Sequence, residues 1–429
     1  MNRFSSSESP ISKQAHGLKD RVRRDSERYD ETFRVGVEIE GCLLDKKGML
    51  VNAAPLIEAL KGKTHELDFE YGICQFEYKT PPTPMHNLLD LNTLFEEFIE
   101  RLNAIVQKVY KNREMVFPVF LGANPSPEIL KYDDNNNNNY RFVTSKPRYK
   151  KLARWQSEIP DVEIEGLKFK ALQVPAAIQG FHLHLQGQNP FHTAQMFNHI
   201  LNLIPSAIIL GANSRLLAGR VFSFHEPRIH LYDQSEQQNS GFPTISRYLN
   251  GVEDYIDYIT SRDKIIAKDY FELEKERHDD ARIRLNSKYY RVETRIMSVQ
   301  PTPKSLMAMI EFFIGYIYMA IHEDRQLRPL SSLREERLSA VRSGFDAKTH
   351  FNITDTIRNQ LDFARKGLSN LDIKSEFLSI LDKRLEHKTT PGGYVAKLWQ
   401  DKFNGSTEQT LFEVLSDIWE RTKNNIPIT

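Results

Sequence analysis

The sequence predicts an α+β fold in which one antiparallel sheet carries helices on its apolar face and a binding site on its other face. Two observations support this prediction. Strand-like segments are scattered between helical ones, without the regular alternation of a doubly wound parallel sheet. Several of these strands place two polar side chains at positions i and i+2, which point to one face, while apolar side chains point to the other.

The composition is that of a soluble globular protein, with 429 residues, 40% hydrophobic and 27% charged. The formal net charge of +1 gives no case for nucleic acid as a partner. We expect no membrane span, because the most apolar helical stretch, 306–321, contains Glu311 and indicates a buried helix. The two cysteines, Cys42 and Cys74, favour a reducing compartment, so we expect a cytoplasmic protein.

We expect three regions along the chain. Residues 1–30 are rich in Ser, Arg and Asp, which predicts a flexible arm with one helical turn near 18–24. Residues 31–325 are predicted to form the domain that carries the site. Residues 326–429 are predicted to be helices packed on that same domain, with a break at 389–393.

Hydrophobic spacing and turn residues predict the elements of the first third of the chain. A strand at 33–45 is followed by a turn at Lys46-Lys47-Gly48 and a second strand near 49–52. Further on we predict a strand pair at 67–80, a helix at 84–112, a short strand at 116–121 and a loop at 122–127. The run Asn135–Asn139 favours neither helix nor strand, so we expect a loop that is either inert or a lid.

The same patterns predict the elements that follow. They are a strand at 170–187, a helix at 194–217 that is continuous or broken at Pro205, an irregular segment at 219–250, a helical segment at 251–276, a strand at 288–299 and a helix at 302–323. The irregular segment is rich in arginine, which suits an anionic substrate, and we expect Arg228 to contact it.

Glu38 and Glu40 form the first polar pair, in the segment Gly36-Val-Glu-Ile-Glu40. Val37 and Ile39 would face the core, so both carboxylates would share the opposite face. One interpretation is a plain exposed strand face. The other is a metal site, because two adjacent glutamates repel each other and a divalent cation relieves that repulsion.

His182 and His184 form a second pair on an otherwise apolar strand. They are either hydrogen-bonded core histidines or ligands. Zinc is disfavoured because no third His or Cys follows at ligand spacing, whereas a neutral imidazole can also bind a harder metal or contact phosphate.

Glu77 and the pair Glu293 and Arg295 complete the set. An ion pair with Lys79 is the plain alternative for Glu77, and a structural salt bridge is the plain alternative for the Glu–Arg pair. As site residues, the glutamates would hold a metal and Arg295 would stabilise phosphoryl charge. The sequence contains no phosphate-binding loop of the G-x-x-x-x-G-K-[ST] type, so arginines and metal would have to hold a nucleotide.

In order and spacing, five segments resemble the glutamate–cysteine ligase type 2 family, ATP-dependent carboxylate–amine ligases related in fold to glutamine synthetase. The segments are Gly36-Val-Glu-Ile-Glu40, Gln75-Phe-Glu77, Gly180-Phe-His-Leu-His184, Leu210-Gly-Ala-Asn-Ser214 and Arg291-Val-Glu-Thr-Arg295. The match around 220–232, where the family binds its amino acid, is loose, so the sequence does not identify the substrate.

The resemblance implies a strongly curved antiparallel sheet that forms a funnel around ATP and Mg²⁺ or Mn²⁺. It implies metal ligands at Glu38, Glu40, Glu77, His182 and Glu293, nucleotide contacts at His182, His184, Arg228 and Arg295, and catalytic roles for Glu77 and Arg295.

The implied reaction is ATP-dependent amide formation through an acyl phosphate, with small amino acids or amines as substrates, as in the glutamate–cysteine ligation of glutathione synthesis. Two rival functions stay open. One is a guanidino-kinase-like phosphotransferase, and the other is a non-catalytic nucleotide- or metal-binding protein. Homo-oligomerisation also stays open.

Overall fold

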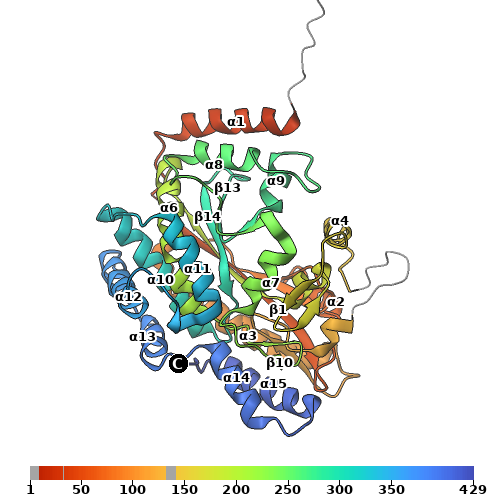
Figure 1. Cartoon of the computed structure of the whole chain (residues 1–429). Coiled ribbons are helices and arrows are strands. Elements are labelled where there is room, and N and C mark those ends of the chain that lie inside the picture. The colour runs from red at the N-terminus through yellow and green to blue at the C-terminus, as the bar shows by residue number, and fades with distance from the viewer. Residues whose placement is uncertain (1–8, 32, 132–141) are drawn as a thin grey trace, which may run out of the picture.

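A large antiparallel sheet lies at the centre of the molecule, and helices surround it (Figure 1). The computed structural model describes residues 9–31, 33–131 and 142–429. The predicted Asn135–Asn139 loop and the first eight residues lie outside the described residues. The α+β class and the antiparallel sheet are confirmed.

The sheet has eight strands, in the order β13-β14-β8-β1-β3-β2, with β4 and β5 also paired to β1. All its pairings are antiparallel. The strands are β1 (Arg34–Asp45), β2 (Leu67–Phe69), β3 (Gln75–Lys79), β4 (Thr83–Pro84), β5 (Val116–Val119), β8 (Gly180–Gln186), β13 (Ala281–Arg284) and β14 (Arg291–Ser298).

The register brings the polar pairs of neighbouring strands side by side. Glu38 on β1 lies opposite His182 on β8, and Glu40 lies opposite Glu77 on β3. On the next pairing, Glu293 of β14 lies opposite His184 of β8. Because residues in register share a face, the predicted site residues gather on one side of the sheet.

The apolar face of the sheet is covered by three long helices, α3 (Asp90–Val109), α6 (Pro190–Gly211) and α10 (Pro303–His322). The side chains of β1 that alternate with the glutamates are fully buried there. α6 continues through Pro205 without a break. α10 is the one helix of the described residues long and apolar enough to cross a membrane, but 83% of its apolar window is buried within the protein.

The C-terminal helices pack against α6, α10 and the lower part of the sheet (Figure 1). They are α11 (Leu330–Ser343), α12 (Ile353–Asn370), α13 (Leu378–His387), α14 (Pro391–Lys402) and α15 (Thr407–Lys423). α12 lies directly against α10, where Gly315 and Gly367 meet without side chains between them. The predicted break at 389–393 is confirmed, since α14 begins at Pro391.

The helices opposite the polar face of the sheet are shorter. They are α4 (Pro147–Gln156), α5 (Val174–Ala177), α7 (Pro227–Glu236) and α9 (Tyr270–Glu276). α8 (Val252–Thr260) packs on α1 and α6, and α2 (Ala54–Leu60) packs on α3. Three two-stranded sheets complete the fold, namely β6 (Val162–Ile164) with β7 (Leu167–Phe169), β9 (Leu216–Leu217) with β10 (Arg220–Val221), and β11 (Ser240–Gly241) with β12 (His278–Asp279).

The N-terminal segment is not the predicted flexible arm over residues 10–25. It forms helix α1 (Pro10–Asp25), which begins after the capping side chain of Ser9. Ala15, Leu18 and Val22 are spaced by three and four and are buried against α8 and α9. The many charged residues between them hide this narrow apolar stripe, and the prediction of a single helical turn is wrong.

Four other predictions need correction. Residues 171–177 form a 3₁₀ turn and α5 rather than a strand, because Pro175 has no N–H for a ladder. The segment 219–250 contains α7, with Pro227 in its first turn. The segment 251–276 is two helices, and residues 49–52 form only an isolated bridge to β1.

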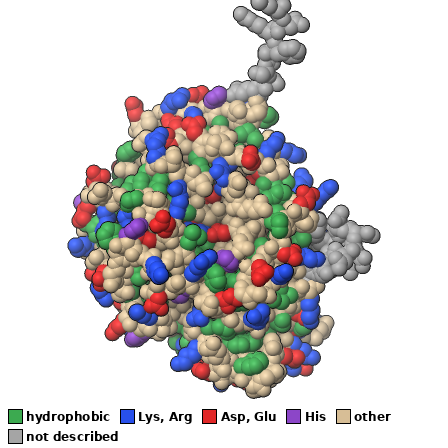
Figure 2. All heavy atoms as spheres, in the orientation of Figure 1, with side chains coloured by type: hydrophobic (Ala, Val, Ile, Leu, Met, Phe, Trp, Pro, Cys, Tyr) green, Lys and Arg blue, Asp and Glu red, His purple; other side chains and the backbone are tan. Residues whose placement is uncertain are grey.

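Positive and negative side chains are interspersed over the face of the molecule seen in Figure 2, and hydrophobic side chains appear in small groups. This pattern agrees with the near-zero net charge.

Candidate active site

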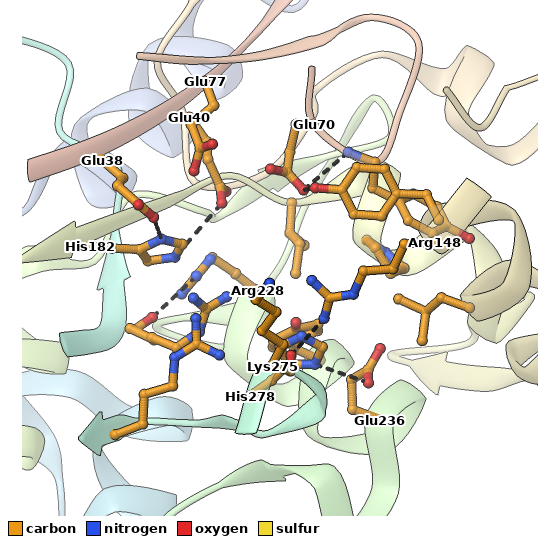
Figure 3. A pocket seen from close by; sticks show the side chains of 18 of the residues that line it. Glu38, Glu40, Glu70, Glu77, Arg148, His182, Arg228, Glu236, Lys275 and His278 are labelled. Carbon is orange, nitrogen blue, oxygen red and sulfur yellow. Dashed lines mark hydrogen bonds and ion pairs between the residues drawn. The ribbon is translucent and has the colours of Figure 1, made fainter. Parts of the chain in front are cut away.

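A cavity of about 220 Å³ lies on the polar face of the sheet. The sheet forms one wall, and residues of α4, α5, α7 and α9 form the other (Figure 3). Six of the predicted site residues line it, namely Glu38, Glu40, Glu77, His182, Arg228 and Arg295. His184 and Glu293 are not lining residues, but each contacts residues that are.

Glu38, Glu40 and His182 lie at the centre of the sheet wall. His182 Nδ1 is 3.3 Å from Glu38 Oε2, and its Nε2 is 3.7 Å from Glu40 Oε1. Glu40 also accepts a hydrogen bond from the backbone N–H of Gly180. His184 Nε2 is 3.4 Å from Glu38 Oε1, yet neither ring nitrogen of His184 forms a hydrogen bond within the described part of the chain.

Two groups of these side chains bring ligand atoms within 4.8 Å of one another. One group is Glu38, His182 and Glu293, and the other is Glu40, Glu77 and His182. Carboxylate oxygens dominate both groups, which is the donor type that Mg²⁺ and Mn²⁺ prefer.

The carboxylates of this cluster differ in charge state because their neighbours differ. Burial, together with the charges of Glu38 and Glu70, raises the pKa of Glu77 well above its usual value. Burial also raises the pKa of Glu38, but His182 and His184 stabilise its charged form and hold that pKa well below its usual value. The carboxylates of this cluster are therefore crowded, and a cation bound between them would relieve their mutual repulsion.

Glu293 has a different environment from the other glutamates. Its two oxygens accept 2.8 Å hydrogen bonds from Arg282, and Oε1 also lies 2.5 Å from Arg295 Nη1. Burial raises its pKa, but Arg282 and Arg295 outweigh that effect and keep it well below its usual value. The salt bridge between Glu293 and Arg295, which the sequence analysis gave as the alternative to a metal and phosphate site, is therefore present.

Glu77 also has its plain alternative partner, since Lys79 Nζ lies 2.7 Å from Glu77 Oε2. These ion pairs do not exclude metal or phosphate binding, because both pairs sit at the edge of the same cavity. The roles of the individual site residues stay predictions.

A second part of the cavity lining is basic, and its residues come from both walls. They are Arg148, Arg228, Arg282, Arg284, Arg295 and Lys275. Arg228 is buried and donates 3.3 Å hydrogen bonds to the backbone carbonyls of Arg295 and Ile296, while its Nε has no hydrogen-bond partner among the described residues. Arg282, Arg284 and Arg295 have carboxylate partners, whereas Arg148 and Arg228 form no ion pair among the described residues. Guanidinium groups of this second kind are suited to bind an anion.

Arg337, on α11, holds the two walls of the site together from outside the cavity. It donates to both oxygens of Asp280 at 2.5 and 2.8 Å, and to both oxygens of Asp233 at 2.6 and 3.0 Å. The Asp280 carbonyl in turn accepts the backbone N–H of Arg295 at 2.8 Å. Asp233 lies on α7, which also carries Arg228.

The sequence analysis missed several residues of the cavity. Glu70, Tyr149, Glu236 and His278 line it together with Arg148, Arg282 and Arg284. The pair Arg282 and Arg284 has the same i, i+2 spacing as the predicted pairs and was detectable by that signal. The others come from short elements that reach the cavity only through tertiary packing, and no local pattern marks them.

Glu236 is a fully buried acid, and Glu70 is a partly buried one. Burial and the charge of Glu40 raise the pKa of Glu70 to about 7, and Glu70 accepts hydrogen bonds from Tyr149 Oη and the Tyr71 N–H, both at 3.0 Å. Burial raises the pKa of Glu236 to about 8. Such shifted acids are common in catalytic clefts.

A family model described as glutamate–cysteine ligase family 2 (GCS2) matches residues 34–398. The chain belongs to glutamate–cysteine ligase family 2. This confirms the resemblance found in the sequence. Among curated protein sequences, none matches this chain.

Two solved structures share the fold of this family member. A bifunctional glutathione synthetase from Pasteurella multocida aligns with a TM-score of 0.60 and 14% identity, covering 95% of this chain and 54% of that protein. A glutamate–cysteine ligase from Francisella tularensis, solved in complex with AMP, aligns with a TM-score of 0.55 and 12% identity, covering 92% of this chain and 90% of that protein. This chain thus spans about half the length of the Pasteurella protein.

Proposed function

We propose that this protein is an ATP-dependent carboxylate–amine ligase that forms an amide bond through an acyl phosphate. The observation that supports it most is the division of one cavity into a carboxylate–histidine side and an arginine side, in a chain of glutamate–cysteine ligase family 2. One side suits a divalent cation and the other suits phosphate and carboxylate groups. We also propose that the curved sheet forms a funnel around these substrates.

The side chains present fit Mg²⁺ or Mn²⁺. Glu38, Glu40, Glu77 and His182 would hold the metal, with Glu293 as a further ligand. The crowded carboxylates and the hydrogen-bond-free ring of His184 support this assignment, because such groups are costly to bury without a ligand. When bound, the metal would reduce charge repulsion at the phosphates of ATP.

The protein's own groups would act mainly by positioning and by charge stabilisation. Arg295 and Arg228 would hold the transferring phosphoryl group, while His182 and His184 would contact the nucleotide phosphates or the metal. An oxygen of the substrate carboxylate attacks the γ-phosphorus, ADP leaves, and an acyl phosphate forms. The amine then attacks the acyl carbon, and phosphate leaves with the transferred oxygen.

Glutamate and cysteine are the first substrates that we propose, on the family's name, which would place the product in glutathione synthesis. A kinase that phosphorylates a guanidino nitrogen and a non-catalytic binder are the rivals. The buried arginines and the carboxylate cluster occur together in one cavity, which favours phosphoryl transfer over simple binding.

An isotope experiment separates these functions. Glutamate with ¹⁸O in its carboxylates is incubated with ATP, Mg²⁺ and cysteine, and other acid–amine pairs are screened in parallel. A ligase transfers ¹⁸O to the released phosphate, because the attacking carboxylate oxygen leaves with phosphorus. A kinase phosphorylates its acceptor and leaves the label in the acid, and a binder releases no phosphate. If no productive pair labels phosphate, the ligase mechanism is wrong.

A further inference from the structure

A histidine–carboxylate pair lies on the wall of the cavity that faces the sheet. His278, on β12, and Glu236, at the end of α7, both line the cavity (Figure 3). His278 Nδ1 lies 3.2 Å from Glu236 Oε2. Neither residue belongs to the carboxylate cluster described above, and the proposed phosphoryl transfer does not use them.

Glu236 is held in a fixed position. It is fully buried, and its Oε1 accepts a 2.5 Å hydrogen bond from Gln156 Nε2. Gln156 is itself fully buried, and its Oε1 accepts a 3.0 Å hydrogen bond from Tyr71 Oη. This chain of contacts aims the second oxygen of Glu236 at the imidazole of His278.

The contact with Glu236 selects the tautomer of His278 according to the charge of Glu236. Burial raises the pKa of Glu236 to about 8, while Arg148 and Arg295 favour its charged form. In that charged form the carboxylate accepts the Nδ1–H, and the lone pair of the ring is on Nε2. Within the described part of the chain, Nε2 has no hydrogen-bond partner, and the ring borders the cavity. A base oriented by a carboxylate, with its free nitrogen towards a substrate cavity, is the arrangement that activates nucleophiles in many enzymes.

The charges around His278 keep its ring neutral and make it a weak base when no substrate is bound. Burial lowers its pKa well below the usual value, and Arg295, Arg282, Arg148 and Arg277 lower it further. Glu236 is the carboxylate that faces it, and the ring of Tyr232 packs beside it at 5.6 Å. Anionic phosphates bound to these arginines would weaken their repulsion of an imidazolium, so the base would strengthen when substrates are present.

The proposed reaction needs a proton acceptor at its second step. An amine that attacks an acyl phosphate becomes positively charged, and it must lose a proton to yield a stable amide. The arginines that line the cavity are permanently protonated and cannot accept it.

We propose that His278 Nε2 accepts this proton and that Glu236 acts as its positioning residue. The role rests on the ligase function proposed above. The amine lone pair forms the C–N bond, and the carbonyl π electrons move to oxygen. The N–H proton passes to Nε2, the carbonyl re-forms, and the C–O bond to phosphate breaks with its electron pair on the leaving phosphate.

Glu70 is the competing proton acceptor in the cavity. Its Oε1 already accepts hydrogen bonds from Tyr149 Oη and the Tyr71 N–H, and the charge of Glu40 acts on it. Glu70 therefore lies beside the carboxylate cluster proposed for the metal, whereas His278 is surrounded by the arginines proposed for the anionic groups. The location of His278 favours it as the base.

Hydroxylamine distinguishes proton transfer from the earlier chemistry. It is uncharged near neutral pH and traps acyl phosphates as hydroxamates with little need for a base. His278→Asn keeps an N–H for Glu236 but has no imidazole lone pair. We expect amide formation from glutamate and cysteine, or from the productive pair of the isotope screen, to fall by about 10²–10⁴-fold. Hydroxamate formation from the same acid should stay within about fivefold of wild type.

Matched variants complete the design. His230→Asn, on α7 but outside the cavity lining, should leave both products at wild-type levels. Glu236→Gln should shift the acidic limb of kcat/KM for the amine to lower pH, because loss of the carboxylate weakens the base, and should leave the hydroxamate profile in place. If the two residues had only a structural role, their variants would lower both products together and would leave the acidic limb of the kcat/KM profile at its wild-type pH.

Several results would overturn this role. One is a parallel loss of amide and hydroxamate in His278→Asn, and another is wild-type amide formation by that variant. If His278→Asn does not fold, the Glu236→Gln variant decides. An acidic limb of kcat/KM for the amine that stays at the wild-type pH would contradict the role of His278. Selective loss of amide in Glu70→Gln, without loss in His278→Asn, would assign the base to Glu70. If the wild-type enzyme makes neither amide nor hydroxamate from any acid, the proposed ligase function is wrong. This result differs from those above, which contradict only the role of His278.

Discussion

Glu293 and Glu77 are both predicted metal ligands, but the structure predicts opposite effects on stability when each becomes glutamine. The buried carboxylate of Glu293 accepts three hydrogen bonds from two guanidinium groups, the buried Arg282 and the partly buried Arg295, and a third, Arg284, lies 3.8 Å away. Removing its charge leaves Arg282 and Arg295 without their carboxylate partner, while Arg284 keeps Glu274 at 3.4 Å. Breaking a buried ion pair from one side costs about 3–5 kcal/mol, so Glu293→Gln should lose that much unfolding free energy.

Glu77 has mainly like charges around it. Glu38, Glu40 and Glu70 all raise its pKa, and its one cationic partner, Lys79, is about half exposed. An ion pair of that kind contributes roughly 0–1 kcal/mol. Glu77→Gln should therefore leave the stability of the metal-free protein unchanged or increase it by about 1 kcal/mol.

Urea denaturation in the presence of a chelator at neutral pH measures both effects. The slope of unfolding free energy against urea should be the same for all variants, so that shifts in midpoint report stability. Glu58→Gln, which removes an exposed ion pair with Lys61, is the control and should stay within about 0.5 kcal/mol of wild type. If the unfolding free energies of Glu293→Gln and Glu77→Gln lie within about 1 kcal/mol of each other, the reasoning is wrong. Glu293 would then not be stabilised by its arginines more than Glu77 is by its surroundings.

Three further predictions follow from the same contacts. Turnover should require Mg²⁺ or Mn²⁺ and stop when a chelator is added. Glu38→Ala should lose activity while keeping its circular dichroism spectrum. Full activity after thorough chelation would exclude the metal role. Arg295→Lys keeps the charge but not the planar fork, so kcat should fall by about one to three orders of magnitude, and a wild-type rate would reduce Arg295 to a salt bridge. Glu311 accepts backbone N–H groups of residues 376–378, and burial raises its pKa to about 7. A raised carboxyl pKa stabilises the fold fully below the unfolded value of 4.5 and loses that contribution as pH rises through 7. Between about pH 5 and 8, wild type should therefore lose roughly 3 kcal/mol relative to Glu311→Gln in denaturation experiments, and a pH-independent difference would contradict this.

The polar face of the sheet was predictable because it depends on a local rule. In β1, β8 and β14 the i, i+2 pairs alternate with buried apolar residues, so the sequence alone indicates which side chains share a face. The antiparallel register then brings Glu38 next to His182 without further information. The same rule applied to β13 would have found Arg282 and Arg284, but a strand of four residues gives a weak signal.

The opposite wall of the cavity was not predictable in this way. Arg148, Glu236 and His278 come from two short helices and a two-residue strand that approach the sheet only in the folded protein. α7 has no clear apolar stripe, because its buried side faces the polar cavity as well as the core. α1 was missed for a different reason, since its apolar stripe is narrow and charged residues lie between its members.

The contacts of Arg337 bear on how this protein can be divided or engineered. Its guanidinium joins the C-terminal helices to Asp280 and Asp233, and through them to the backbone of Arg295 and to α7. The helices after residue 325 are therefore not an exchangeable module. A shortened chain that ends before α11 would leave the buried carboxylate of Asp280 and the partly buried one of Asp233 without their cation. A graft of foreign helices would need an arginine at this position to preserve the shape of the cavity.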